Sequence, residues 1–474
     1  MLREGMRMHI PGIGTSGMPG IARILHHRGI EVSGSDDWSS AAMADLAGMG
    51  IELSSGFDID RVRDVDLVVR HAAMGDDNIE LIAARRNGID VVSRARLLGE
   101  LAEGRRTIGV AGTHGRGTVT SMIAWILECA DMAPSFVASA RLNNLGVEAR
   151  DGDGEWFVIE LDEPSDTTHV LECDYMVCSF LELSDLRGAG AGDAREPRDW
   201  VEVMTAALEA NRRLKEAFVN LDCRANRELV RRLAMRPTGY GVEHPVEYRA
   251  TGVDGDEKAN CFAAFHRDRQ IGEFGLVVPG PHNVINAMGA IAVARRIGVS
   301  TPVIIKALQS YEGLQNRYIA ARGGGVTIIK NFVDHPSSIE QALESAGVDF
   351  EGRMIAVYAP YRVSLNETVR RELSDAFSVC DCVVVADPSQ AGGDIDDLLQ
   401  TFHSREVQVC TVEHSLSDEL SAMAQRGDKI LFFGDDEFLH RADELQARLA
   451  IRAGRAPAET GQPRLDGPLA EGDG

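Results

Sequence analysis

The stretch 109-GVAGTHGRGTVTSM-122 decides how this sequence is interpreted. It joins a short apolar run to a glycine-rich turn and then to a helix-forming segment. Backbone N–H groups in such a turn, with the positive end of the following helix, can bind a phosphate group. Gly112, Gly115 and Gly117 allow the tight backbone path. The stretch therefore predicts a strand, a phosphate-binding loop and a helix, the alternative being a strand-to-helix turn without a nucleotide.

Two side chains depart from an ordinary phosphate loop. Arg116 stands where such loops carry Lys, and Gly117 stands where they carry a Ser or Thr whose hydroxyl holds Mg²⁺. Arg keeps the positive charge but is planar and forked, whereas Lys is a compact point charge. Thr118 and Thr120 offer hydroxyls, but they lie about 100° and 300° further round the helix. The sequence therefore predicts a phosphate cradle with altered cation and metal chemistry.

Length and composition limit the classes of protein to consider. The chain has 474 residues, which predicts two or three domains. Its formal net charge of −24 argues against nucleic acid or an anionic membrane as a partner. No run of about 18 apolar residues is present, and the N-terminus has no apolar leader. The eight Cys form no metal-binding pattern, so we expect small buried thiols and a cytoplasmic location.

Alternating strand and helix patterns predict an α/β protein with parallel sheets covered by helices. Residues 1–104 and about 317–452 show this βαβ rhythm, and a central segment, 105–316, opens on the phosphate loop. A long helix is expected from about Trp200 to Ala217 in the centre. The tail, 453–474, is rich in Pro, Gly and acidic residues and is expected to be disordered.

Nine motifs in order resemble those of the Mur ligase family, over nearly the whole chain. The phosphate loop is similar to the family's GTHGKTTTTxM, and 12-GIGTSGMPGIA-22 is similar to GIGGxGMSGIA. The other similar stretches are 32-VSGSD-36, 71-HAAMGDDNIELIAARRNGIDVVSRARLLGEL-101, 143-NNLG-146, 160-ELDEPSD-166, 279-PGPHNVINAMGAIAVA-294, 313-GLQNRY-318 and 330-KNFVDHPSSI-339. The subgroup that joins L-alanine, or a recycled tripeptide, to UDP-N-acetylmuramate resembles the chain most.

The resemblance implies a three-domain ATP-dependent ligase that forms an amide through an acyl phosphate, with ATP and Mg²⁺ as cofactors. It implies a Rossmann-like UDP-substrate domain (1–104), a P-loop-type central domain (105–316) and a Rossmann-like C-terminal domain (317–452). Catalytic roles would fall to Arg116, Glu163 and His335, with Glu163 also a metal ligand. Nucleotide-binding roles would fall to Gly112, Thr113, His114, Gly115, Arg116, Gly117, Thr118, His282, Asn283, Asn286 and Arg317. The UDP part would contact Gly12, Ile13, Gly14, Thr15, Ser16, Gly17, Asp36 and His71.

Departures from the family pattern gather at the ATP chemistry. Gly117 replaces a metal-binding Thr, no His occurs in 178-CSFLELSDL-186 where the family has a metal-binding His, and Asn331 replaces an Asp. Lys330, beside Asn331, is a candidate replacement cation. Two hypotheses follow: a divergent amide ligase acting on a UDP-linked sugar or other small carboxylate, and a pseudoenzyme that binds a UDP-sugar or regulates a partner ligase. Each motif also has a purely structural alternative, such as a solvated acidic loop around Glu163 or an ion pair at Arg317.

Overall fold

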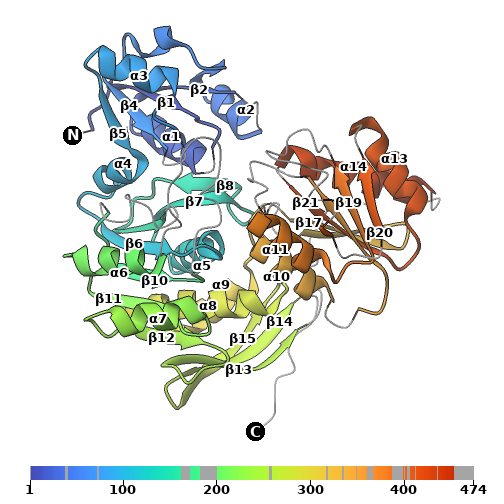
Figure 1. Cartoon of the computed structure of the whole chain (residues 1–474). Helices are drawn as coiled ribbons and strands as arrows, with labels where there is room; N and C mark the ends of the chain where they lie inside the picture. The colour runs from blue at the N-terminus through green and yellow to red at the C-terminus, as the bar shows by residue number, and fades with distance from the viewer. Residues whose placement is uncertain are drawn as a thin grey trace.

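The computed structural model arranges the chain as three sheets, each covered by helices (Figure 1). The parallel strand pairing in all three sheets confirms the predicted α/β class. The described residues are 2–15, 17–37, 41–71, 74–161, 171–181, 200–255, 259–315, 319–331, 333, 336–347, 350–359, 367–386, 399, 401–402, 406–410, 413–434 and 436–452. The predicted disordered tail, 453–474, lies outside them.

The N-terminal sheet is parallel throughout, with strand order β3-β2-β1-β4-β5. The chain order changes direction between the neighbouring strands β1 and β4, and in such sheets ligands bind at the carboxyl ends of the strands at this point. Its elements are β1 (Arg7–Pro11), α1 (Met18–His27), β2 (Glu31–Asp36), α2 (Ala41–Gly48), β3 (Glu52–Ser55), the 3₁₀ turn η1 (Ile59–Val62), β4 (Leu67–Arg70), α3 (Ile79–Arg86), β5 (Asp90–Ser93) and α4 (Arg94–Leu101).

The central sheet has the order β15-β14-β13-β12-β11-β10-β6-β9-β7-β8, with a parallel middle and antiparallel edges. Helices α5, α8 and α9 pack on one face, and α6 and α7 pack on the other. The strands are β6 (Arg106–Ala111), β7 (Ser135–Leu142), β8 (Val147–Arg150), β9 (Trp156–Glu160), β10 (Tyr175–Cys178), β11 (Glu216–Asn220), β12 (Thr238–Gly241), β13 (Tyr248–Gly255), β14 (Asn260–His266) and β15 (Arg269–Leu276). The helices are α5 (Arg116–Cys129), α6 (Trp200–Ala210), α7 (Arg224–Arg232), α8 (Pro281–Arg296) and α9 (Thr301–Gln309).

The long helix predicted from about Trp200 to Ala217 is wrong in its last turns. Helix α6 ends at Ala210, and β11 begins at Glu216. Strand β11 pairs in parallel with β10, and its last four residues are buried. Pairing with a neighbouring strand therefore overrides the local helical preference of the segment.

The N-terminal and central sheets meet through close packing of α1 on β8. A Cβ added to Gly20 would lie 2.7 Å from the Cβ of Ala149, so glycine permits this approach. Arg28 Nε donates to Asp151 Oδ2 at 2.7 Å across the same contact. One apolar core, which includes Ile21 and Leu161, runs from the N-terminal sheet to the central one. The two sheets are thus fixed relative to each other.

The C-terminal sheet has the order β16-β17-β21-β18-β19-β20, with β16 antiparallel to β17. Apolar cores lie on both of its faces. Its elements are β16 (Ile319–Gly323), β17 (Val326–Asn331), α10 (Pro336–Gly347), β18 (Met354–Tyr358), α11 (Glu367–Phe377), β19 (Cys382–Ala386), β20 (Glu406–Cys410), α13 (Glu413–Met423), β21 (Lys429–Phe433) and α14 (Asp436–Arg452). In Figure 1, α10 and α11 stand on the side of this unit that faces the central elements.

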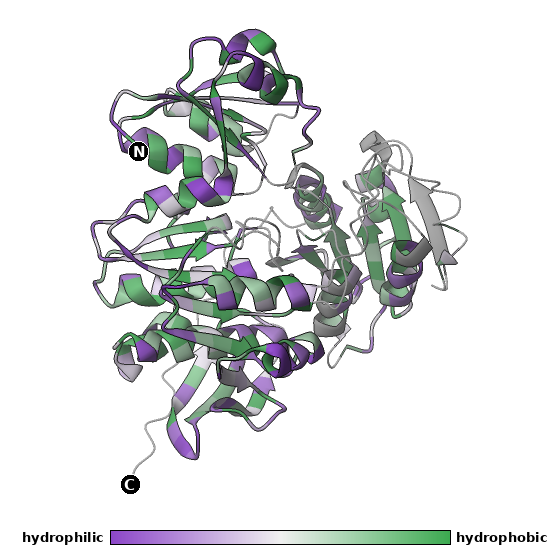
Figure 2. Ribbon diagram, turned by 60° about the vertical axis from the view of Figure 1, so that its left-hand side comes forward, coloured by the Kyte–Doolittle hydropathy of each residue, from purple (hydrophilic) through white to green (hydrophobic). Residues whose placement is uncertain are grey.

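Hydrophobic residues concentrate in the strands, and hydrophilic residues colour the outward faces of the helices (Figure 2). Among the residues that the structure describes, no helix combines the length and the apolarity needed to cross a membrane. Five cysteines, Cys173, Cys178, Cys223, Cys380 and Cys382, are buried as expected. Cys261 on β14 is exposed, which corrects the expectation for that residue, because the outer antiparallel strands have one face in solvent.

Candidate functional site: two glycine loops and the end of β9

The phosphate loop connects β6 to α5 and has a fixed backbone. Gly112 has φ 143° and Gly115, the N-cap of α5, has φ 78°, both values that favour glycine. The N–H of Thr113 donates to the carbonyl of Phe180 at 2.7 Å, and Ser179 Oγ donates to the carbonyl of His114 at 2.6 Å. The loop is therefore pinned to the end of β10. The N–H groups of Gly117 and Thr118 lie in the first helical turn, where no acceptor within the helix is available.

The guanidinium of Arg116 lies against the end of β9. Its Nη1 donates to the carbonyl of Leu161 at 2.9 Å, and its Nε lies 4.0 Å from Glu160 Oε1. The side chain is mostly buried, with 16% of it exposed. The structure therefore places this cation beside the loop, at the strand end that leads to residues 162–163. Glu163, the predicted metal ligand and catalytic carboxylate, lies outside the described residues.

Gly117 is enclosed by side chains that leave little room for a hydroxyl. An added Cβ would lie 2.8 Å from Ser139 Oγ and 3.2 Å from Glu160 Oε2. That carboxylate oxygen also accepts the N–H of Ser139 at 2.6 Å. Within the described residues, no group of three or more His, Cys, Asp and Glu side chains could hold a metal ion. At Gly117 the loop therefore offers no side-chain oxygen to a metal ion, and the surrounding side chains leave little space for one.

Helix α8 brings three of the predicted nucleotide-binding residues to this loop. Asn286 Oδ1 would lie 2.6 Å from a Cβ on Gly115, and Asn286 Nδ2 donates to Asn283 Oδ1 at 3.4 Å. His282 lies in the first turn of the same helix, and desolvation within the protein lowers its pKa to about 4. The structure thus places Asn286 against the loop and Asn283 beside it, and their predicted role in nucleotide binding stays a prediction. Arg317, also predicted here, lies outside the described residues.

The C-terminal unit touches the phosphate loop directly. Ser338 Oγ on α10 lies 2.8 Å from His114 Nδ1, and the His114 ring packs on Phe180. Asn331 is buried at the end of β17. His335 lies outside the described residues. Lys330 is not a replacement cation for the loop, because its Nζ donates to Asp443 Oδ1 at 2.9 Å within the C-terminal unit.

A second glycine loop joins β1 to α1 and carries most of the predicted UDP-binding residues. Gly12 has φ 71°, and Gly17, the N-cap of α1, has φ 80°. The N–H of Gly14 donates to Asp36 Oδ2 at 2.9 Å, and Ile13 is buried below the loop. Thr15 closes the turn with an N–H bond to the Gly12 carbonyl at 2.9 Å. Ser16 lies outside the described residues.

A pocket of about 540 Å³ opens beside this loop, at the carboxyl edge of the N-terminal sheet. His71 is the first residue of the turn that leads to Met74, which lines the pocket. Gly12 of the loop lies close to the same lining, because a Cβ on Gly12 would be 2.7 Å from Met74 Cε. The sequence predicted no role for the individual lining residues, although most of them belong to the 71–101 motif. The pocket is lined by Asp37, Phe57, Met74, Gly75, Asp77, Asn78 and Ile79.

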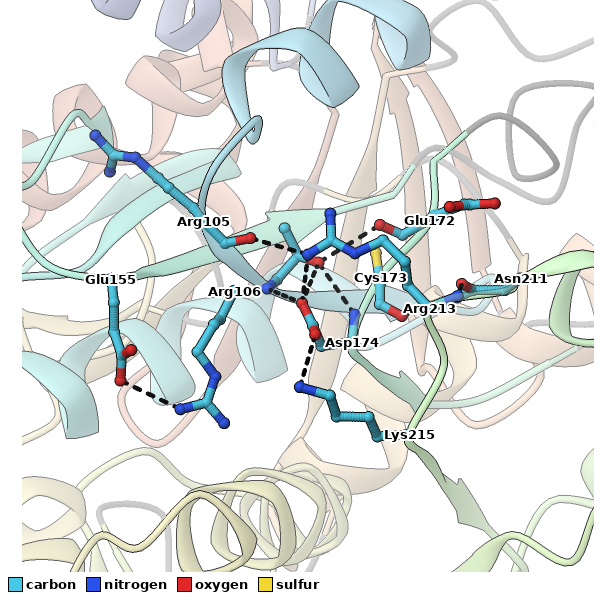
Figure 3. A network of polar contacts seen from close by, with 10 residues as sticks. Arg105, Arg106, Glu155, Glu172, Cys173, Asp174, Asn211, Arg213 and Lys215 are labelled. Atoms are coloured by element: carbon cyan, nitrogen blue, oxygen red, sulfur yellow. Dashed lines mark hydrogen bonds and ion pairs between the residues drawn. The ribbon is translucent and has the colours of Figure 1, made fainter.

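The opposite edge of the central sheet carries a charge cluster around Asp174 (Figure 3). This buried carboxylate accepts the N–H of Thr107 at 2.9 Å and Arg213 Nη2 at 2.8 Å, and Lys215 Nζ lies 3.0 Å away. Desolvation alone would raise its pKa, but the hydrogen bond from Thr107 and the charges of Lys215 and Arg213 outweigh it. The pKa of Asp174 is therefore lowered.

Comparison with known proteins identifies the family. The model of the Mur ligase family, catalytic domain, matches residues 7–106. A UDP-N-acetylmuramate–L-alanine ligase from Sinorhizobium fredii is 32% identical over 466 residues, which cover 94% of this chain and 98% of that ligase. The chain belongs to the Mur ligase family.

Solved structures show that this Mur ligase family member shares its fold over almost its whole length. The UDP-N-acetylmuramate–alanine ligase of Thermotoga maritima superposes with a TM-score of 0.77 at 22% identity, covering 95% of this chain and 100% of that chain. A murein peptide ligase from Psychrobacter arcticus gives a TM-score of 0.72 at 20% identity, covering 94% of this chain and 99% of that one. At these sequence identities, the two similarities show a shared fold.

Proposed function

We propose that this Mur ligase family member binds UDP-N-acetylmuramate, or a closely related UDP-linked sugar acid, on its N-terminal sheet and ATP on its central sheet. It would act in the cytoplasm as an amide-forming ligase with divergent, impaired ATP chemistry. The division into domains at 104/105 and 316/317 is part of this proposal. The observation that carries it is the pair of glycine loops, one on each sheet, each leading into a helix. Arg94 near the first loop and Arg116 near the second both donate to carbonyls at the end of β9.

The N-terminal site suits a sugar nucleotide in two parts. The first turn of α1 and the glycine loop offer N–H groups and a positive helix end to a diphosphate. The adjoining pocket holds two carboxylates, Asp37 and Asp77, and an aromatic ring, Phe57. Carboxylates accept hydrogen bonds from ribose hydroxyls or a base N–H, and the ring offers an apolar wall to the base. The pocket therefore suits the uridine rather than the anionic phosphates.

The central site suits the phosphates of ATP, which would supply the phosphoryl group that activates the substrate carboxylate. Gly112 and Gly115 shape the cradle, and Arg116 would supply the positive charge beside it. The enclosed Gly117 offers no oxygen for a metal. Charge neutralisation is a main source of catalysis in phosphoryl transfer. A loop with Arg116 and Gly117 should therefore turn ATP over slowly.

The same observation favours a second candidate function. A chain that keeps the sugar-nucleotide site and has no hydroxyl at position 117 would serve as a pseudoenzyme that binds a UDP-sugar. In that case the His114–Ser338 contact between the central and C-terminal units would hold the protein in one arrangement that a partner ligase could recognise.

Calorimetric titration separates these functions. The purified protein is titrated with UDP-N-acetylmuramate and, separately, with ATP in the presence of Mg²⁺. Binding of both supports the ligase, binding of the UDP compound alone supports the pseudoenzyme, and binding of neither contradicts the proposal. A Phe57→Ala variant should lose UDP-N-acetylmuramate affinity, whereas Asp60→Ala, on the exposed turn η1 nearby, should not.

A further inference from the structure

Arg94 is a buried cation between the two glycine loops. It is the first residue of α4, belongs to the N-terminal unit and is 3% exposed. Its guanidinium packs on the N-cap glycine of α1, because a Cβ on Gly17 would lie 2.9 Å from Nη2 and 3.4 Å from Cζ. Arg94 belongs to the stretch 71–101 that resembles the family, but no role was predicted for it from that resemblance. Its burial at the start of α1 places a permanent positive charge beside the proposed diphosphate site.

The same guanidinium reaches the central sheet. Arg94 Nη2 donates to the backbone carbonyl of Glu160 at 3.4 Å, at the end of β9. The neighbouring carbonyl, of Leu161, accepts from Arg116 at 2.9 Å, and the Glu160 carboxylate lies beside Arg116. The consecutive carbonyls of Glu160 and Leu161 thus accept from two guanidinium groups. Arg94 lies beside the first glycine loop, and Arg116 lies beside the second. The end of β9 is a short physical connection between the loops.

We propose that Arg94 is a positioning residue that couples ligand binding at loop 12–17 to ligand binding at loop 112–118. This inference rests on the proposed function, in which the first loop holds a diphosphate. An anion beside Gly17 holds the Arg94 guanidinium in place, and the guanidinium in turn orders the end of β9. An ordered Glu160 then presents a single geometry to Arg116 and Ser139, so less ordering remains for a nucleotide to impose.

The coupling is reciprocal and measurable. Each ligand should raise the affinity of the other by the same factor, since linkage between two binding sites is symmetric. A coupling factor of at least about 5 is expected, the lower end of the usual range. A merely structural Arg94 would lower stability or both affinities without changing this factor.

The experiment measures the affinity of UDP-N-acetylmuramate with and without a saturating non-hydrolysable ATP analogue, and then the reverse, in wild type, Arg94→Ala, Arg94→Lys and Arg96→Ala. In Arg94→Ala the coupling factor should fall to about 1. Arg94→Lys keeps the charge and the stem, so it retains the fold, but it loses the fork that spans Gly17 and Glu160 and should lower the factor as well. Arg96, on the same helix, is half exposed and pairs with Glu100, so its variant is the matched control and should keep the wild-type factor.

The outcomes are distinct. A wild-type factor of about 1, or a factor that survives both substitutions of Arg94, overturns this inference and leaves the proposed function standing. Failure of the wild type to bind UDP-N-acetylmuramate overturns the proposed function and this inference with it. A factor that falls in both Arg94 variants and persists in Arg96→Ala supports the coupling.

Discussion

Strand β6 connects two edges of the central sheet that are built in opposite ways. At its amino end, the Asp174 carboxylate is matched by protein donors from Thr107, Arg213 and Lys215 (Figure 3). At its carboxyl end, Gly112 and Gly115 hold positive φ values, and the first turn of α5 points N–H groups out of the helix. One edge satisfies its charges within the protein, and the other leaves donors for a ligand. The stable Asp174 cluster at the amino edge helps to hold the constrained glycine loop at the carboxyl edge.

The largest expected effect comes from removing the amino-edge carboxylate. Asp174→Ala leaves the buried N–H of Thr107 without its acceptor and should lower the free energy of unfolding by about 2–4 kcal/mol. Urea denaturation measures this change. Glu155→Ala, at the same edge, removes an exposed partner of Arg106 and should change stability by less than about 1 kcal/mol. Equal losses in both variants would remove the distinction between buried and exposed charges.

Acid titration sharpens the same prediction. Because the folded pKa of Asp174 is lowered, its contribution to stability is complete above the ordinary carboxyl pKa of about 4 and is lost as the pH falls through the folded value. Asp174→Asn should therefore flatten the acid limb of the stability curve.

The carboxyl edge should respond in binding more than in stability. Gly115→Ala forces a side chain onto φ 78° and toward Asn286, at a cost of about 1–3 kcal/mol, or about 5- to 150-fold in nucleotide affinity. Gly298→Ala is the control, because Gly298 also has positive φ but meets nothing within 4 Å. Gly298→Ala should lower the stability of the protein and leave its nucleotide affinity unchanged. Unchanged nucleotide affinity in Gly115→Ala would show that this loop is not a phosphate cradle.

Arg116 tests whether the cation beside the loop serves the ligand. Arg116→Ala should weaken nucleotide binding about 10- to 150-fold, since a hydrogen bond to a charged group is worth about 1.5–3 kcal/mol. Arg150→Ala, which breaks the ion pair with Glu128 elsewhere on α5, should not. If calorimetry finds equal affinities for Arg116→Ala and wild type, Arg116 serves only to hold the end of β9.

The last expected effect is absent at neutral pH and appears only in mild acid. His282 is neutral when folded because its pKa is lowered to about 4, whereas an unfolded His takes up a proton below about pH 6.5. Stability should therefore decline as the pH falls from about 6.5 toward 4. His282→Asn, which cannot protonate, should flatten this slope in thermal unfolding. An identical slope would place the titrating group elsewhere.

The sequence was most informative where strands and helices alternate regularly. Residues 1–104 show the predicted alternation of strands and helices, and the glycine loop in the stretch 109–122 lies between a strand and a helix as predicted. Strands β11 to β15 were not expected. Strand β11 is short and follows a helix-like segment, so its pairing with β10 decides its conformation, and local pattern cannot reveal such pairing.

The candidate site shows the same limit. Motif spacing located the residues of the two loops, but it could not indicate where long side chains turn. Arg116 faces the Leu161 carbonyl, Lys330 faces Asp443, and Arg94 spans two sheets. Each of these contacts joins residues at least 45 positions apart, so it depends on the assembled fold.

The central claim is that this Mur ligase family member keeps its sugar-nucleotide site while its phosphate loop is altered. Its most direct test is phosphate release from ATP with Mg²⁺, UDP-N-acetylmuramate and L-alanine, using protein shown by calorimetry to bind the UDP compound. The account predicts turnover slower than about 0.1 s⁻¹, below the usual range of about 1–10³ s⁻¹. Turnover within that usual range would contradict it and show that Arg116 and Gly117 support ordinary ligase chemistry.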